Sequence, residues 1–304
     1  MLLLAAMIWG FAFSAQKAAQ AVPPFTLGAA RSLIAGLFLL ALIPVLDKIR
    51  HTGRSLVSKS RPLDFNKYEL IGGAICGAVL VTATFFQQFG MASGADAGKA
   101  SFITALYVVL VPIYAIALRK RAPINVWVSI VIAVVGFYFL CIQGDFSIET
   151  PDLIVFVCAL IFPIHILAID HFSPRCDGVR MSCIQFFVGT IINAILAIIT
   201  EMPVNFANVW QNIMPILFLG IMSSGVAYTL QIIGQRGANP AAASIIMSLE
   251  SVFGVVGAAM LLGERMTTRE YIGAAIVLVA VLLSQLDIDA IKKSYKNKKN
   301  ANIS

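Results

Sequence analysis

The sequence is organised as long runs of hydrophobic residues separated by short polar segments. Runs of about 20 apolar residues recur from end to end, and this is the length at which an α-helix crosses the hydrocarbon core of a bilayer. The pattern predicts an all-α polytopic membrane protein with ten transmembrane helices. The predicted helices cover residues 2–20, 25–46, 69–91, 98–118, 123–143, 152–171, 178–200, 210–233, 240–262 and 269–286.

Composition supports this prediction and narrows the function. Of 304 residues, 59% are hydrophobic and only 12% are charged, and the mean hydropathy is +0.89. A soluble domain of this length needs far more charge to cover its surface, so no separate soluble domain is expected. The net charge of +7 comes from basic residues in short loops. Membrane topology produces this arrangement, and no nucleic-acid partner is expected.

Motifs for several other functions are missing from the sequence. Its five cysteines are odd in number and form no C-x-x-C, so neither a disulfide framework nor a metal site is predicted. No phosphate-binding glycine loop and no H-E-x-x-H motif occurs, which argues against ATP-driven transport and metalloprotease activity within this chain. No cofactor is expected. Met1 opens into an apolar run that lacks the basic region of a cleaved signal peptide.

Basic residues fall mainly on one side of the predicted membrane topology. If the lysine-rich tail is cytoplasmic, the segments on its side of the membrane hold 17 of the 22 Lys and Arg residues. The acidic loop at 145–152 then faces outward. Because Lys and Arg are enriched in cytoplasmic loops, both termini are predicted to be cytoplasmic.

Two segments of the chain resemble one another at an offset of 143–144 residues, with Gln87 matching Gln231 and Gly90 matching Gly234. Each half carries five predicted helices, and an odd number forces the second half to insert upside down relative to the first. Inverted repeats with a binding site between them near the bilayer midplane are a recurrent transporter plan. The predicted units are residues 1–144 and 145–287, followed by a basic cytoplasmic tail at 288–304.

One carboxylate lies deep inside an apolar run. Glu250 follows Pro240 by ten residues, so it is expected roughly 15 Å along the helix, near the middle of a ~30 Å hydrocarbon core. A carboxylate at this depth is a functional candidate because placing its charge there is costly. It could bind a proton or a cationic group of a solute. The alternative is a carboxylate that neighbouring helices hold for packing.

Short motifs in a fixed order give the chain a family resemblance. They are Trp9-Gly10, Arg31, Tyr107-Val108-Val109-Leu110-Val111-Pro112, Leu249-Glu250 and Gly263-Glu264-Arg265. In this order and spacing the chain resembles the EamA branch of the drug/metabolite transporter superfamily. The resemblance implies a secondary transporter, not an enzyme, in a bacterial plasma (inner) membrane. It also implies a small solute, amino-acid-like or otherwise polar or amphipathic, with export as the expected direction.

The mechanism that the resemblance implies is alternating access around a central cavity. The expected partners are a small-molecule substrate and the lipid bilayer, and the resemblance leaves proton coupling and a homodimer open. The alternative function is a membrane-embedded enzyme or a lipid-handling scaffold that uses the same cavity. That alternative needs a clustered catalytic constellation, which the polar residues do not obviously form.

The polar candidates each have a structural alternative. Arg31 could clamp a substrate carboxylate in a bidentate pair, or its side chain could extend along the helix toward water. The amides of Gln87, Gln88 and Gln231 could face one shared cavity, because two of them match in the repeat, or they could join neighbouring helices by hydrogen bonds.

Aromatic side chains and one histidine complete the predicted substrate or coupling-ion pathway. His165 could titrate near neutral pH, or it could be a neutral side chain bonded to a carbonyl group. Trp9, Phe13, Tyr107 and Tyr228 could form an apolar substrate box, although any aromatic residue in a helix bundle can serve packing alone.

Overall fold

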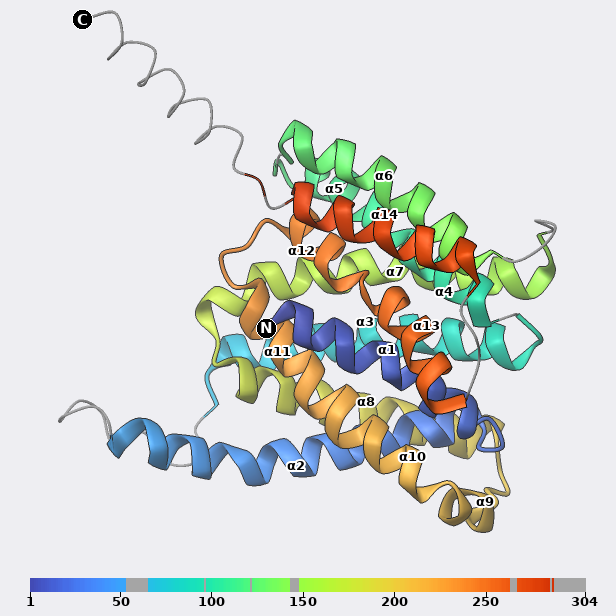
Figure 1. Cartoon of the computed structure of the whole chain (residues 1–304). Helices are drawn as coiled ribbons and strands as arrows, with labels where there is room; N and C mark the ends of the chain where they lie inside the picture. The colour runs from blue at the N-terminus through green and yellow to red at the C-terminus, as the bar shows by residue number, and fades with distance from the viewer. Residues whose placement is uncertain are drawn as a thin grey trace, which may run out of the picture.

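Figure 1 shows a computed structural model of the chain, which describes residues 1–52, 65–95, 97–120, 122–142, 148–262, 267–284 and 286. All regular elements in these ranges are helices and none is a strand, so the all-α prediction is confirmed. Several predicted features lie outside the described residues: most of the basic loop after Thr52, Asp145 of the acidic loop, the Gly263-Glu264-Arg265 turn and the tail at 288–304.

The helices follow the apolar runs closely. The order is α1 (Leu2–Ala18), α2 (Pro24–Thr52), α3 (Lys67–Ala92), α4 (Ala97–Ala105), α5 (Tyr107–Ala117), α6 (Ile124–Cys141), α7 (Thr150–Phe172), η1 (Ser173–Arg175), α8 (Gly178–Thr200), α9 (Phe206–Gln211), α10 (Ile213–Phe218), η2 (Leu219–Ala227), α11 (Tyr228–Gln235), α12 (Pro240–Met247), α13 (Glu250–Leu262) and α14 (Thr268–Ser284).

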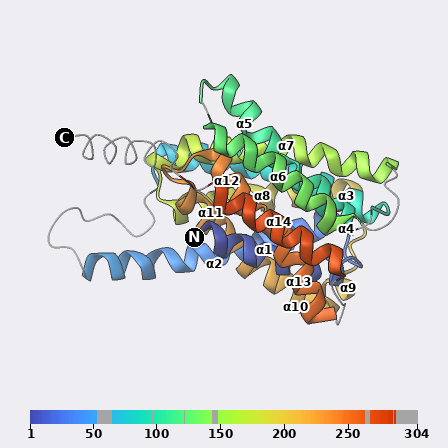
Figure 2. The ribbon, with the colours of Figure 1, turned by 45° about the horizontal axis from the view of Figure 1, so that its top comes forward.

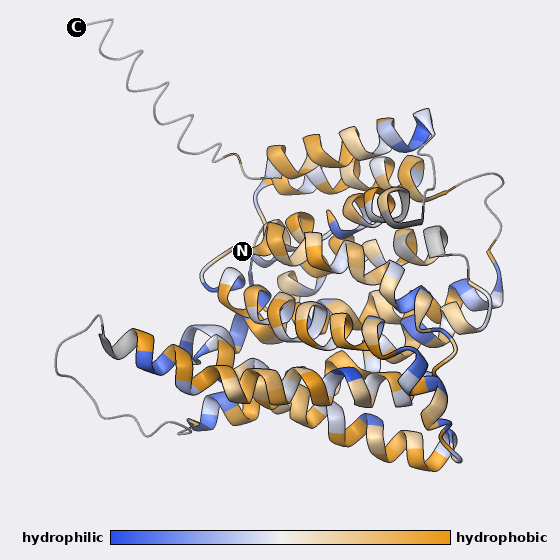
Figure 3. Ribbon diagram, turned by 60° about the horizontal axis from the view of Figure 1, so that its bottom comes forward, coloured by the Kyte–Doolittle hydropathy of each residue, from blue (hydrophilic) through white to orange (hydrophobic). Residues whose placement is uncertain are grey.

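Seven helices in the described ranges are long and apolar enough to cross a membrane, and two further apolar helices, Leu2–Ala18 and Phe102–Ala117, are shorter. The protein is therefore a polytopic membrane protein, and the count of ten spans stays a prediction. Figure 3 shows apolar residues along most of every helix and hydrophilic residues mainly near helix ends. Many outward-facing side chains are large and apolar, which suits contact with lipid, for example Leu37, Val131, Ile195 and Val279.

Three of the predicted helices are interrupted in the structure. The run at 98–118 breaks at Leu106, between α4 and α5, and the run at 240–262 breaks at Ser248 and Leu249, between α12 and α13. At the second break the backbone tightens into a turn, with Leu249 N bonded to Ile246 O and Ser251 N bonded to Ser248 O. The run at 210–233 is divided into α9, α10, the π-helical segment η2 and α11. Such breaks and π segments are frequent at functional sites.

Helices far apart in the sequence pack as pairs. In Figure 1, α6 and α14 lie together along one edge of the bundle and α2 runs along the opposite edge, and Figure 2 keeps α6 beside α14 after rotation. The other extensive pairs are α2 with α8, α3 with α7 and α1 with α13. The helix ends gather at two opposite ends of the bundle, as the contacts of Asp47 with Arg180 at one end and of Thr26 with Glu201 at the other illustrate.

The α1–α13 pair makes a backbone contact at Gly10. A Cβ atom added at Gly10 would lie 2.4 Å from Cβ of Phe253 and 2.7 Å from the backbone N of Gly254. A Cβ atom added at Gly254 would meet nothing closer than 3.6 Å. The close approach of these two helices therefore requires glycine at position 10 and tolerates a methyl group at position 254.

Gly10→Ala is expected to lower the free energy of unfolding by about 1–3 kcal/mol, because the methyl group forces α13 away from α1. Gly254→Ala, in the same interface, is expected to be neutral or slightly stabilising, since alanine is the better helix former. Thermal unfolding of both variants in detergent compares them directly. Equal stability of the two variants would contradict the packing described here.

Candidate functional site

A cavity lies in the middle of the bundle where the interrupted helices meet. The space open to the centres of water molecules is about 60 Å³, and one water needs roughly 10–15 Å³ on this measure, so the cavity holds a few waters or a small solute. Eight of the nine pathway residues expected from the sequence line it: Trp9, Arg31, Gln87, Tyr107, His165, Tyr228, Gln231 and Glu250. The ninth, Gln88, lines a second cavity beside it.

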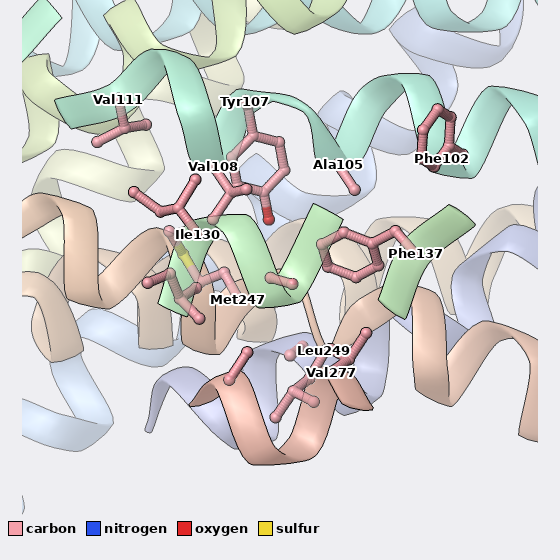
Figure 4. Close-up of a cluster of buried hydrophobic side chains, with 14 of the residues drawn as sticks. Phe102, Ala105, Tyr107, Val108, Val111, Ile130, Phe137, Met247, Leu249 and Val277 are labelled. Carbon is pink, nitrogen blue, oxygen red and sulfur yellow. The ribbon is translucent and has the colours of Figure 1, made fainter. Parts of the chain in front are cut away.

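Two helix starts meet at the cavity. Tyr107 is the first residue of α5 and Glu250 is the first residue of α13, directly after the two helix breaks. The Tyr107 hydroxyl donates to Oε1 of Glu250 at 3.5 Å, a long hydrogen bond. Figure 4 shows Tyr107 and Leu249 among the buried apolar side chains around these breaks. The backbone thus brings the carboxylate and the phenol together from opposite halves of the chain.

Arg31 contacts the same cavity from α2. Its guanidinium lies next to the Tyr228 hydroxyl, and the Tyr228 ring packs on the Trp9 ring with centroids 4.7 Å apart. The Trp9 indole donates to the backbone oxygen of Ser223 at 3.2 Å. Because Ser223 belongs to the π-helical segment η2, this segment directly supports the aromatic wall of the cavity.

Burial and charge define what the cavity can bind. Glu250 supplies a carboxylate and Arg31 a guanidinium, and no ion pair joins them among the described residues. Both tyrosines of the cavity are buried: Tyr107 lies beside the Glu250 carboxylate and Tyr228 lies beside the Arg31 guanidinium. Burial disfavours the charged form of an acid that has no cation beside it. The cavity therefore offers a protonatable acid and a separate cation to a solute.

The glutamines differ in how fully they are paired. Gln87 donates to the Thr104 hydroxyl at 3.2 Å. Gln231 is 2% exposed, and its Oε1 atom has no hydrogen-bond partner. A buried unpaired oxygen that lines a cavity is a place where a solute can donate a hydrogen bond. The Nε2 atom of His165 is bonded at 3.2 Å to Oε1 of Gln185, which is the carbonyl oxygen of a side-chain amide.

Several lining residues were not among those predicted. Gln185 on α8 bonds His165, and Thr104 on α4 bonds Gln87. A signal for the first existed in the sequence, because Ser182, Gln185, Gly189 and Asn193 recur at helical spacing and give α8 one polar face. Thr104 has no comparable signal, since an isolated threonine in an apolar helix is ordinary.

Comparison with known proteins places this geometry in a family. The EamA-like transporter family matches residues 1–142 and again residues 150–286. The chain belongs to the EamA-like transporter family. It is therefore a member of the drug/metabolite transporter superfamily, and the predicted membership is confirmed. The protein is a multi-pass membrane transporter.

Relatives of this EamA-like transporter agree with that assignment. An uncharacterized transporter of Archaeoglobus fulgidus is 30% identical over 289 residues, covering 94% of this chain and 85% of the relative. Uncharacterized transporters of Methanothermobacter thermautotrophicus and Clostridium kluyveri are 24% and 23% identical, covering 86% and 76% of this chain and 77% and 76% of their own. A crystal structure with 18% identity superposes with a TM-score of 0.72, covering 93% of this chain and 94% of its own, which shows a shared fold.

The two cavity glutamines of this EamA-like transporter are expected to respond differently to replacement by leucine. Gln231→Leu should weaken solute binding by about 1–3 kcal/mol with little loss of stability, because it removes an oxygen that is already unpaired. Gln87→Leu should also lower stability, because it removes a buried hydrogen bond that joins α3 to α4. Solute affinity and melting temperature, measured on both variants, separate the two effects. An equal loss of stability in the two variants, with unchanged solute affinity, would show that these side chains serve the structure alone.

Proposed function

We propose that this protein is a secondary transporter that moves a small metabolite across the plasma membrane by alternating access, with export as its direction. The solute is amino-acid-like or another small polar or amphipathic organic molecule. The observation that carries the proposal is the central cavity, where an acid and a base from different helices meet without pairing. A transporter needs polar groups that a solute can satisfy in an otherwise apolar bundle.

The proposal includes two inverted repeats, residues 1–144 and 145–287, with a basic tail at 288–304. Recurring contacts support it. The α3–α7 pair corresponds to the η2–α1 pair when the two repeats are exchanged. In the same way, the α1–α13 pair corresponds to the α7–α5 pair. Tyr107 and Glu250, at the two matching helix breaks, are 143 residues apart, close to the sequence offset of the repeat. Rocking of one repeat against the other would expose the cavity to each side in turn.

Within this mechanism Glu250 is the proton-coupling group and Arg31 binds a negatively charged part of the solute. The other lining side chains, Gln87, Gln231, Trp9, Tyr107, His165 and Tyr228, shape the cavity or bind the solute, and Gln88 lies beside its continuation. A neutral Glu250 is compatible with the dry interior, and a charged one becomes favourable when the cavity opens to water. Opening on alternate sides would thereby load and release a proton.

Flux in proteoliposomes tests the transport function. Purified protein is reconstituted, a panel of radiolabelled amino acids and small organic acids is supplied, and both uptake and chemical identity of the internal label are measured. Saturable flux of an unchanged solute is the expected result. Conversion of the solute without net flux would favour the alternative, a membrane enzyme in the same cavity, and lipid movement between leaflets would favour a lipid-handling scaffold.

The lysine tail is expected in the cytoplasm and the segment near Glu149 outside, because 17 of the 22 Lys and Arg residues then lie inside. Reporter fusions after Ser304 and near Glu149 check this, using a phosphatase that is active outside and a fluorescent protein that is active inside. An external tail would contradict the proposed orientation and the inverted insertion of the second repeat.

A further inference from the structure

A second cavity adjoins the central one between α2, α3 and α8. The space open to the centres of water molecules is about 30 Å³, which suits a carboxylate-sized group or two to three waters and not a whole metabolite. Arg31 and Thr84 line both cavities, so the two meet at these side chains. A solute at this junction can place one group in each cavity.

The polar groups of the second cavity are one guanidinium, two hydroxyls and three amides. It is lined by Arg31, Ser32, Thr84, Gln88, Gln185 and Asn193 and by no acidic residue. Asn193 already donates to the Gly189 carbonyl at 2.8 Å, and its Oδ1 atom is packed against Gly28, where a Cβ atom would come within 2.6 Å. Asn193 therefore belongs to the helix packing, and the Thr84 hydroxyl likewise donates within α3, to the carbonyls of Leu80 and Val81. The donors that remain for a ligand are those of Arg31, Ser32, Gln88 and Gln185.

Gln185 links the two cavities. Its Oε1 atom is bonded to Nε2 of His165 at 3.2 Å, which turns the amide nitrogen the other way. The amide nitrogen of Gln185 has no hydrogen-bond partner, although Gln185 is only 1% exposed. Leaving a buried amide donor unpaired is costly, and an acceptor from a bound solute would satisfy it.

Arg31 lacks a counterion in the part of the chain that the structure describes: its close polar neighbour is the Tyr228 hydroxyl and no ion pair includes it. A guanidinium deep in a helix bundle is stabilised by an anion with two oxygens, because its donors form a planar fork that matches a carboxylate. The charge of Arg31 and the free amide of Gln185 thus call for the same kind of ligand group.

We propose that the second cavity binds the carboxylate of the transported solute through Arg31, Gln185 and Ser32, while the rest of the solute occupies the central cavity beside Trp9 and Tyr228. This inference rests on the proposed transport function and narrows the class of solutes that the protein transports. Transported solutes carry a carboxylate, and Gln185 is a specificity-determining residue. The bond from Gln185 to His165 fixes the direction of the amide and makes His165 a positioning residue for the carboxylate.

Matched solutes test the inference by direct binding. Trp127→Phe and Trp210→Phe leave Trp9, which packs on Tyr228 in the central cavity, as the only tryptophan reporter. Propionate is compared with propionamide, and L-alanine with L-alaninamide, because each pair differs only in the carboxylate. The acid of at least one pair is expected to change Trp9 fluorescence with at least about tenfold higher affinity than its amide.

Variants of the second cavity assign this preference to residues. Gln185→Met and Arg31→Gln are expected to reduce the preference for the acid about tenfold, because they weaken binding of the acid more than binding of the amide. Gln235→Met is the matched control, because Gln235 is also 1% exposed with an unpaired amide but lines neither cavity. It is expected to keep the wild-type preference. If Gln185→Met does not fold, His165→Phe, which removes the group that orients the amide, is compared in the same way, and the preference for the acid is expected to fall.

Four results would overturn the inference. They are equal affinity for acid and amide, no response to any of these solutes, an unchanged preference in both cavity variants, and inorganic phosphate binding as tightly as propionate, which would indicate a general anion site. Its failure is distinguishable from failure of the transport proposal. If amides are transported at the same rate as acids, the carboxylate site is rejected and the transport function is supported. If acids bind selectively but no flux occurs, the carboxylate site is supported and the transport function is rejected.

Discussion

Glu250→Gln is expected to abolish accumulation of solute against its gradient while preserving exchange of solute across the membrane. A glutamine keeps the shape of the side chain and can still accept a hydrogen bond from the Tyr107 hydroxyl, which lies 3.5 Å from Oε1 of Glu250. It cannot take up or release a proton. Solute binding and the conformational cycle therefore remain, and the link between proton movement and solute movement is lost.

The size of the effect follows from the driving force. A gradient of one pH unit supplies about 1.4 kcal/mol per proton, so transport coupled to one proton accumulates solute about tenfold. In the glutamine variant, proteoliposomes under the same gradient should stop at the concentration reached by passive equilibration. Counterflow of labelled against unlabelled solute, without a gradient, should continue.

Tyr107→Phe is the matched control for this result. It removes the hydrogen bond that Glu250→Gln can keep, and it leaves a carboxylate that can titrate. Accumulation should persist in this variant, because the proton carrier is intact. Wild-type accumulation in Glu250→Gln would show that coupling resides elsewhere, and a Glu250→Gln protein that fails to reach the membrane would favour the packing role for this carboxylate.

Depth along an apolar run was enough to single out two residues that line the central cavity. Glu250 and Arg31 stand out in the sequence because charges are rare in membrane-spanning helices, and the structure brings both to one cavity. The sequence could not show that they remain unpaired. That separation depends on how α2 and α13 pack against other helices, through Tyr228 and Tyr107, and helix packing has no local sequence code.

The helix breaks were harder to foresee. The apolar runs at 98–118 and 240–262 carry no glycine or proline at the break positions, where Leu106 and Ser248 stand. At Ser248 the side-chain hydroxyl bonds the carbonyl of Ile245 at 2.7 Å, and serine forms such local bonds inside continuous helices as well. The sequence therefore predicts helix correctly on both sides of each break but not the break itself.

Adjacent glutamines illustrate a further limit of the linear pattern. Gln87 and Gln88 look equivalent in the sequence, yet neighbouring residues on an α-helix point about 100° apart. Gln87 lines the central cavity and Gln88 lines the second one. Two adjoining cavities, one lined by each glutamine, give a reason for the doubled amide that the sequence alone does not supply.

The α2–α8 pair is held together by polar contacts at both ends. At the end where α2 finishes, Arg180 of α8 donates two hydrogen bonds to Asp47, at 2.6 and 3.3 Å. At the end where α2 begins, the Glu201 carboxylate accepts from the backbone N–H groups of Phe25 and Thr26 and from the Thr26 hydroxyl, all within 2.8 Å. If the α2–α8 pair forms the gate of the proposed alternating-access cycle, one of these ends separates while the other stays closed.

Asp47→Ala is expected to lower the free energy of unfolding by about 2–4 kcal/mol, because it leaves a nearly buried guanidinium without its partner. The side chains of Arg180 and Asp47 are only 10% and 17% exposed. Adding Arg180→Met to Asp47→Ala should recover most of that loss, since no unpaired charge then remains. Asp170→Ala breaks the Lys120–Asp170 pair, in which Lys120 is 44% exposed, and should cost less than about 1 kcal/mol.

Loss of the Asp47–Arg180 contact is also expected to open one end of the α2–α8 pair, and the thiol of a native cysteine can report that opening. Cys183 of α8 is fully buried and faces the backbone oxygen of Gly36 on α2, with 3.7 Å between Sγ and O. With the other four cysteines replaced by serine, Cys183 should react with a membrane-impermeant maleimide faster in Asp47→Ala than in wild type. The reagent should act from the cytoplasmic side, where the proposed topology places Asp47.

Opening at the opposite end should follow Glu201→Gln instead, because that change weakens the bonds to the start of α2. If Asp47→Ala lowers stability but leaves Cys183 protected, the ion pair serves folding and the cytoplasmic gate lies in another helix pair.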